Sequence, residues 1–170
     1  MPQNLELKCR LSAREVPRAL SIARRLGARE AGILTQVDTY YSVPSGRLKL
    51  RSINSRLFQL IHYHRSNTRS SRFSRYSIIS ISQPHDVKKV LHAIFGKPLT
   101  VRKRRRLFLY KNARIHFDTV NRLGSFIEFE VVANRGRKQA VAFMRMLRRV
   151  FQIKPQAIIG VSYRDLLQEG

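Results

Sequence analysis

Hydrophobic and polar side chains alternate along the first segment of the chain. Over residues 4–11 every odd position is apolar and every even position is polar or charged. A period of two is that of a strand with one buried face. Comparable strand patterns recur between turn residues further along the chain, at 31–42, 46–53, 56–65, 71–82, 98–110, 113–120 and 125–133. The sequence therefore predicts about eight strands.

Other segments show helical periodicity. One begins at a capping box formed by Ser12 and Glu15. A second begins at Pro84 and carries an apolar stripe made of Val87, Val90, Leu91, Ile94 and Phe95. A third spans 136–151, and a short helical piece lies near 163–168. Together the patterns predict an antiparallel α+β fold, a closed or nearly closed β-barrel with flanking helices.

The size of the chain favours one domain. It has 170 residues, 43% of them hydrophobic, which suffices for one independent core, so we expect a single domain over 1–170. The N-terminus leads directly into a strand pattern without a signal sequence, which favours a cytoplasmic protein. No apolar stretch approaches the roughly 18–20 residues that a membrane span needs. Cys9 is the single cysteine, so an internal disulfide is excluded.

The net charge is unusually high. The chain has 34 Lys and Arg against 10 Asp and Glu, a formal charge of +24. Such a protein needs an anionic partner, and nucleic acid, anionic lipid and small polyphosphates all satisfy that requirement. The placement of the charges has to distinguish among these partners.

Strand parity sorts the basic residues onto two faces. Lys49 and Arg51 share one face of their strand, with leucines opposite them. In the basic run 101–106, Lys103 and Arg105 share one face and Arg102, Arg104 and Arg106 share the other. Each row taken alone is what a solvated strand face would show. Mixed-sign rows on at least five strands of a closing sheet instead suggest a charged lumen.

Carboxylates are the more informative charges. Five of the ten acidic residues lie in predicted strands, where Asp and Glu are depleted: Glu6, Asp38, Asp118, Glu128 and Glu130. Mg²⁺ and Mn²⁺ prefer oxygen ligands and are commonly held by one or two carboxylates together with substrate phosphates. The alternation therefore indicates a divalent metal site, in which Glu128 and Glu130 can reach the same ion.

Several segments resemble one known family. The opening segment Asn4-Leu5-Glu6-Leu7-Lys8 is similar to the Glu-x-Glu-x-Lys opening of CYTH proteins, which include class IV adenylate cyclases, thiamine triphosphatases and other tunnel triphosphatases. Further segments resemble the family's strands in the family's order, at 36–51, 59–65, 101–105, 114–118, 124–131 and 162–166. The resemblance implies an eight-stranded antiparallel triphosphate tunnel.

The resemblance also implies a role for each inward charge. Catalysis is assigned to Lys8, Lys103 and Arg105, and binding of the triphosphate is shared with Lys49, Arg51, Arg65 and Arg114. Mg²⁺ or Mn²⁺ would be carried by Glu6, Asp118, Glu128 and Glu130. His116 shares the face of Asp118, where it either lines the wall or assists as a proton carrier or ligand. Asp38 receives no definite role.

Two positions depart from the family's pattern. Asn4 stands where many members have the first Glu, and Thr119 follows Asp118 where relatives often have another acid. Both changes remove negative charge from the metal end, which would leave one ion instead of two or weaken metal binding.

Two classes of function follow. The first is a metal-dependent phosphoryl- or nucleotidyl-transfer enzyme, an adenylate cyclase or a triphosphatase, whose substrate is ATP, inorganic triphosphate or thiamine triphosphate. The alternative is a catalytically weak or inactive CYTH fold recruited to bind RNA or a ribonucleoprotein, since Arg102, Arg104 and Arg106 exceed what a small triphosphate requires.

Overall fold

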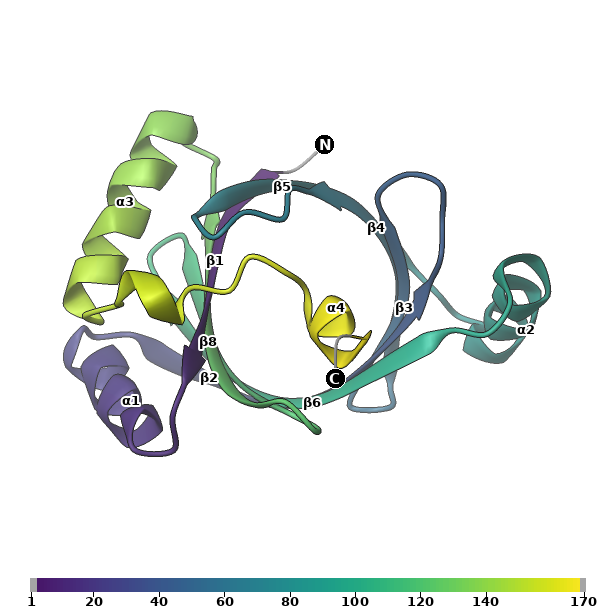
Figure 1. Cartoon of the computed structure of the whole chain (residues 1–170), viewed down its shortest axis with the longest axis horizontal. Helices are drawn as coiled ribbons and strands as arrows, with labels where there is room; N and C mark the ends of the chain where they lie inside the picture. The colour runs from purple at the N-terminus through teal and green to yellow at the C-terminus, as the bar shows by residue number, and fades with distance from the viewer. Residues whose placement is uncertain (1–2, 169–170) are drawn as a thin grey trace.

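Eight strands close into one antiparallel barrel (Figure 1). The computed structural model describes residues 3–168, and the predicted domain limits at 1 and 170 lie outside them. The strands are β1 (Gln3–Leu11), β2 (Arg29–Tyr41), β3 (Arg47–Ile53), β4 (Leu57–Arg65), β5 (Arg72–Ser80), β6 (Leu99–Tyr110), β7 (Ala113–Val120) and β8 (Gly124–Val132). They follow the order β1-β5-β4-β3-β2-β6-β7-β8 around the barrel. The predicted fold is confirmed, with strand ends shifted by two residues or fewer.

Short turns fix the register of the hairpins. Between β3 and β4, Asn54 and Ser55 both have positive φ, 52° and 56°, the backbone of the tight turns that match the twist of antiparallel strands. The resulting register places Arg51 opposite Gln59 and Lys49 opposite Ile61. Because side chains alternate across a strand, this register also determines which residues point into the barrel.

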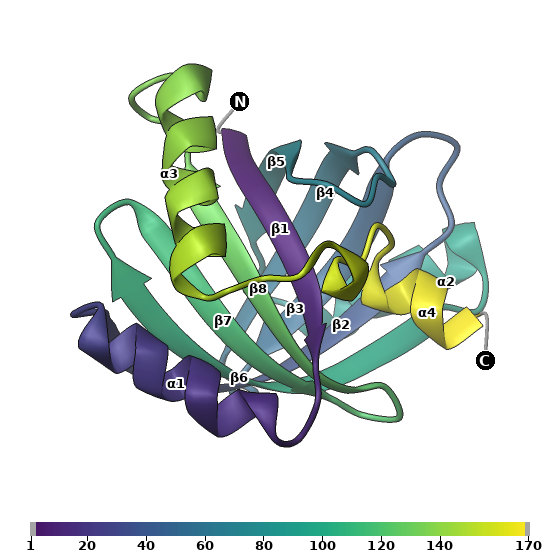
Figure 2. The ribbon, with the colours of Figure 1, turned by 60° about the vertical axis from the view of Figure 1, so that its left-hand side comes forward.

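Two helices cover one outer side of the barrel. These are α1 (Glu15–Arg25) and α3 (Arg137–Val150), which lie on the side away from α2 in both views (Figures 1 and 2). Only half of the predicted capping box is present: the Ser12 backbone N–H and hydroxyl both donate to Glu15 Oε2 at 2.7 Å, whereas no side chain among residues 3–168 caps the first turn of α1. Beneath the helices lies the main core, which includes Leu7, Phe129 and Leu147, all fully buried. The odd residues of β1 thus serve this outer core and leave its even residues for the lumen.

The third helix, α2 (Pro84–Phe95), packs on the opposite outer side. Its Leu91 is buried against Tyr41 and Leu50. The predicted apolar stripe is wrong at two positions, because Val90 and Ile94 are 56% and 65% exposed. The strands beneath α2 contact only one flank of the helix, so the other flank stays at the surface.

The C-terminal segment crosses one mouth of the barrel before it ends in α4 (Tyr163–Gln168) (Figure 1). The Ile159 N–H donates to the Lys8 carbonyl at 2.8 Å. The buried Arg72 donates to the carbonyls of Ile159 and Thr68, at 3.1 and 2.9 Å. These bonds attach the segment to β1 and to the loop before β5, and they hold α4 in a defined position. No helix within residues 3–168 is both long and apolar enough to span a bilayer.

Candidate functional site: a charged lumen

The barrel encloses a cavity of about 320 Å³ that is lined by alternate residues of the strands. All seven cations expected to bind the triphosphate line this cavity: Lys8, Lys49, Arg51, Arg65, Lys103, Arg105 and Arg114. Glu6, Glu128 and Glu130 line it as well. Arg102 and Arg104 instead point outward and are exposed. Strand parity therefore separated the inward from the outward charges correctly.

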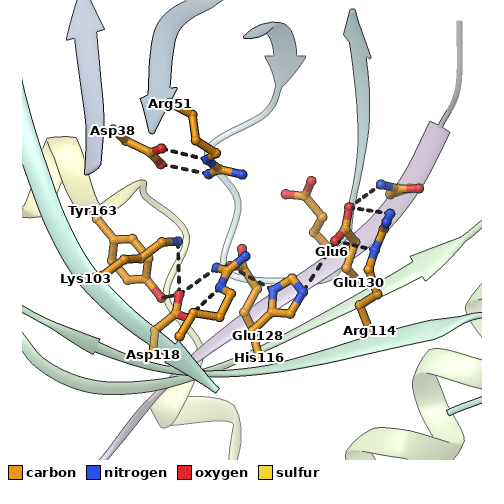
Figure 3. Close-up of polar contacts among 12 residues, drawn as sticks. Glu6, Asp38, Arg51, Lys103, Arg114, His116, Asp118, Glu128, Glu130 and Tyr163 are labelled. Carbon is orange, nitrogen blue, oxygen red and sulfur yellow. Dashed lines mark hydrogen bonds and ion pairs between the residues drawn. The ribbon is translucent and has the colours of Figure 1, made fainter. Parts of the chain in front are cut away.

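Asp118 lies behind two of these cations and does not line the cavity. Its carboxylate accepts two bonds of 2.7 Å from Arg105 and one of 3.2 Å from Lys103 (Figure 3). Burial alone would raise the pKa of Asp118, but the charges of Arg105 and Lys103 outweigh it and hold that pKa well below its usual range. Asp118 is thus an ionised anchor that aims Lys103 and Arg105 into the lumen.

Asp38 forms a second anchor on β2, the strand that pairs with β6. It accepts bonds of 2.7 and 2.8 Å from Arg51 and of 3.1 Å from Lys49. Arg51 and Lys49 overcome the effect of burial and hold the pKa of Asp38 well below its usual range. Burial, together with the charge of Arg51, lowers the pKa of Lys49 to about 7. The sequence showed Asp38 as an acidic residue within a strand but gave it no definite role. Its position opposite Arg51 in the register explains why an acid is placed there.

Tyr163 is the main functional candidate that sequence reasoning missed. It comes from α4, and its hydroxyl donates to Asp118 Oδ2 at 3.0 Å (Figure 3). The Lys8 ammonium lies 3.8 Å from the centroid of its ring. Burial, with a smaller effect of Asp118, raises the pKa of Tyr163 far above its usual value, so the hydroxyl remains a donor. The segment 162–166 was noticed only as a resemblance, since no pattern in it revealed an inward side chain.

Three carboxylates gather on β1 and β8. Glu6 lies directly opposite Glu130 in the register, and Glu128 lies two residues away on the same strand. Arg65 donates to Glu6 at 3.2 Å, and Arg105 donates to Glu128 at 3.0 Å. Burial, followed by the negative charge of Glu128, raises the pKa of Glu6 despite the opposing charge of Arg65. Arg114 contacts Glu130 at 3.0 Å, so each of the three carboxylates has a cationic neighbour.

His116 lies between two of these carboxylates. Its Nδ1 is 3.8 Å from Glu128 and its Nε2 is 3.7 Å from Glu130 (Figure 3). Burial and the charge of Arg105 lower the pKa of His116, which favours a neutral imidazole. Asn4, the departure from the family's pattern, donates its amide to Glu130, and Arg114 contacts the same carboxylate at 3.0 Å. The neutral Asn4 thus occupies the place of a further acid.

The donors suit a hard cation only in part. Among residues 3–168, no group of three or more His, Cys, Asp and Glu side chains converges closely enough to hold a metal ion. Glu6, Glu128 and Glu130 nevertheless offer carboxylate oxygens within one region of the lumen. These residues fit a site in which one or two carboxylates act together with substrate oxygens. Asp118 does not fit, because its oxygens are already bonded to Lys103, Arg105 and Tyr163.

The two ends of the cavity differ. At the α4 end, Tyr163 packs edge-to-face on Phe126 with their ring centroids 4.9 Å apart. At the other end, where β2 begins and β6 finishes, the lining includes Leu34, Leu107 and Ile78. Ile78 is 47% exposed. The lumen is therefore covered by α4 at one end and has a partly apolar rim at the other.

Several solved structures share this architecture. A protein of Pyrococcus horikoshii superposes with a TM-score of 0.84 at 22% identity, covering 96% of this chain and 98% of that one. A conserved hypothetical protein of Pyrococcus furiosus gives a TM-score of 0.83 at 16% identity over 96% and 99% of the two chains. A "putative adenylate cyclase" of Vibrio parahaemolyticus gives 0.74 at 18% identity over 97% of each. These similarities establish a shared fold.

Sequence comparison identifies the family. No curated protein sequence matches the chain. The sequence profile of the CYTH domain, however, matches residues 2–150, which include all eight strands and every inward charge described above. With its closed eight-stranded barrel and its lumen of Lys, Arg and carboxylates, the chain belongs to the CYTH domain family.

Proposed function

We propose that the protein is a metal-dependent enzyme that transfers a phosphoryl or nucleotidyl group of a triphosphate held inside the barrel. The observation that carries this proposal is the state of Arg65. Its side chain lines the cavity, yet its Nε and Nη2 are buried without a hydrogen-bond partner among the described residues. A buried guanidinium with free donors requires an acceptor, and phosphate oxygens match its geometry.

The two anchored pairs support binding without rearrangement. Asp118 holds Lys103 and Arg105, and Asp38 holds Lys49 and Arg51, before any ligand arrives. Donors that are already fixed do not have to reorganise when charge develops on the phosphates during transfer. Phosphoryl transfer depends mostly on such positioning and charge neutralisation, so a covalent nucleophile is not needed.

The carboxylates of Glu6, Glu128 and Glu130 would hold Mg²⁺ or Mn²⁺ beside the substrate. Such an ion would supply positive charge that neutralises part of the charge on the phosphates. In the chain itself, Lys8 lies beside this region, where Glu128 partly offsets the burial that lowers the pKa of Lys8 to about 7. Lys8 thus lies between the carboxylates and the Tyr163 ring, a position suited to contact a phosphate oxygen.

The covered end sets the orientation of the substrate. Because α4 lies across one mouth, a triphosphate would enter from the other with its terminal phosphate leading. An organic group would then remain at the rim formed by Leu34, Leu107 and Ile78. Apolar side chains suit a base or another heterocycle better than they suit phosphate. We therefore favour an organic triphosphate such as ATP or thiamine triphosphate over inorganic triphosphate.

A product analysis tests the proposal. The protein is incubated with ATP, thiamine triphosphate or inorganic triphosphate in the presence of Mg²⁺ or Mn²⁺, and the products are separated. Orthophosphate identifies a triphosphatase, whereas pyrophosphate with cyclic AMP identifies a cyclase. We expect Lys103→Met to abolish turnover and Arg104→Met, its outward neighbour, to leave turnover within about twofold. Metal-independent turnover, or equal losses in the two variants, would contradict the proposal.

A further inference from the structure

Most of the positive charge has no role in the lumen. Seven of the 34 Lys and Arg line the cavity, and five of the ten Asp and Glu lie in it or against it. The lumen is therefore close to neutral, and 27 cations and five carboxylates remain for the rest of the chain. An enzyme that needs positive charge only for a small triphosphate would not require this surplus.

The surplus is strong on the two helices that cover one side of the barrel. Together α1 and α3 carry seven Arg and one Lys against a single acid, Glu15. Glu15, which accepts hydrogen bonds from Ser12, offsets only one of these eight positive charges. Both helices bury their apolar flank on the barrel. Both helices lie on the same outer side of the barrel (Figures 1 and 2), so we group their exposed cations as one basic surface.

Helical spacing aligns the cations of this surface. On α3, Lys138, Arg145 and Arg149 are seven and four residues apart, opposite the buried Met144 and Leu147, and all three are exposed. On α1, Arg18 and Arg25 are seven residues apart and border a crevice of about 300 Å³. These five residues are here named the basic helical face.

The crevice lies where α1 approaches the C-terminal end of α3. Its lining includes Ile22 of α1, Leu26 just after α1 and Val150 of α3, together with Arg18 and Arg25 of the basic helical face. Arg18 donates to Gln152, just beyond α3, which fixes one edge of the crevice. An apolar floor bordered by guanidinium groups can contact a base while the rim holds the adjacent phosphates.

We propose that the basic helical face binds a single-stranded nucleic acid through its phosphodiester backbone, independently of the lumen. Four of its five residues are Arg, whose planar guanidinium matches phosphate oxygens in two-point contacts. A lipid surface fits less well, because both helices bury their apolar flanks in the core and leave no flank for insertion. An acidic protein would require no apolar floor between the cations.

Binding of a labelled 20-nucleotide strand tests the proposal. The strand carries a 5′-hydroxyl, so that no terminal triphosphate engages the lumen, and fluorescence anisotropy is measured over a range of salt concentrations. We expect RNA and DNA of one sequence to bind similarly, with affinity falling steeply as salt rises. The triple variant Arg18→Gln, Arg25→Gln, Arg149→Gln should bind at least tenfold more weakly, and its salt slope should be smaller by roughly two to three.

A matched variant controls for net charge. Arg56→Gln, Arg69→Gln, Arg75→Gln removes three exposed Arg outside α1 and α3, and we expect a change below about threefold. Circular dichroism and triphosphate turnover establish that both triple variants remain folded. Equal losses in the two variants would overturn the proposal. So would stronger, helix-dependent binding to phosphatidylserine vesicles or to polyglutamate than to the nucleic acid.

Discussion

The Tyr163 hydroxyl donates to Asp118 Oδ2 at 3.0 Å, and this bond joins α4 to the charge network of the barrel wall. The same carboxylate holds Arg105 and Lys103. A residue near the end of the chain therefore helps to position two cations on β6. Because the Tyr163 ring also lies beneath Lys8, α4 is a structural part of the proposed site as well as the cover of one mouth.

Two substitutions of Tyr163 separate these roles. Tyr163→Phe removes one hydrogen bond and keeps the ring, so we expect a loss of about 1 kcal/mol in the free energy of unfolding. Tyr163→Ala also removes the contact with Phe126, and we expect a loss of about 3 kcal/mol or more together with a raised KM for the triphosphate. Thermal unfolding and steady-state kinetics measure both effects. Wild-type kinetics in Tyr163→Ala would show that α4 is not part of the site.

Asp118 should matter for stability more than any surface acid. Asp118→Asn leaves the buried Lys103 without its counter-ion and Arg105 with Glu128 alone, for which we expect a loss of roughly 3–5 kcal/mol. The control is Glu30→Gln, which removes the partner of Arg106 on the outer face of β6 and should change the free energy of unfolding far less. Urea unfolding of the two variants compares an inward with an outward pair. Similar losses would contradict the anchoring role of Asp118.

The ionised Asp118 also predicts how the stability of the fold declines in acid. The pKa of Asp118 lies below its value in the unfolded chain, so below about pH 4 the unfolded state binds more protons. The stabilisation from Asp118 is therefore complete above that pH and is lost as the pH falls through the folded pKa. Unfolding measured between pH 6 and 2 should show a shallower acid decline in Asp118→Asn than in the wild type. Parallel curves would contradict the prediction.

The strand patterns revealed the site because alternate residues of a barrel strand point into the lumen and away from it. Lys103 and Arg104 differ by one residue, and the structure places them on opposite faces. Tyr163 could not be found in this way, because α4 reaches the lumen only through the path of the preceding loop. That path depends on long-range bonds, such as those of Arg72, which no local pattern contains. The predicted burial of Val90 and Ile94 was wrong for a related reason. How much of a helix is covered depends on the width of the sheet beneath it, which the helix's own sequence does not contain.

Metal binding should depend on Glu6. We expect Glu6→Gln to weaken Mn²⁺ binding by on the order of tenfold or more, measured by electron paramagnetic resonance of free Mn²⁺ in the presence of triphosphate. Asp86→Asn, an exposed acid in the first turn of α2, is the control and should bind Mn²⁺ like the wild type. Unchanged affinity in Glu6→Gln would place the metal away from the carboxylates of β1 and β8.

Lys49 predicts a pH dependence of ligand affinity. Its pKa is about 7 in the free protein, and a bound triphosphate would favour the protonated ammonium. Binding above pH 7 should therefore take up protons, and metal-free triphosphate should bind more weakly as pH rises from about 7.5 to 9, where its own charge no longer changes. Calorimetry in buffers of different ionisation enthalpy measures the proton uptake directly.

Substitution of Lys49 tests whether this residue is responsible. Lys49→Arg keeps its charge throughout the range, so the decline of affinity with pH should become shallower, although Lys8, whose pKa is also about 7, would still contribute. In the ligand-free protein, the free energy of unfolding should rise with pH, whereas the ligand affinity falls. Between pH 7 and about 10 the unfolded chain binds more protons at Lys49 than the folded one, so stability from this residue rises with pH. If Lys49→Arg retains the wild-type decline in affinity, Lys49 is not the group that titrates.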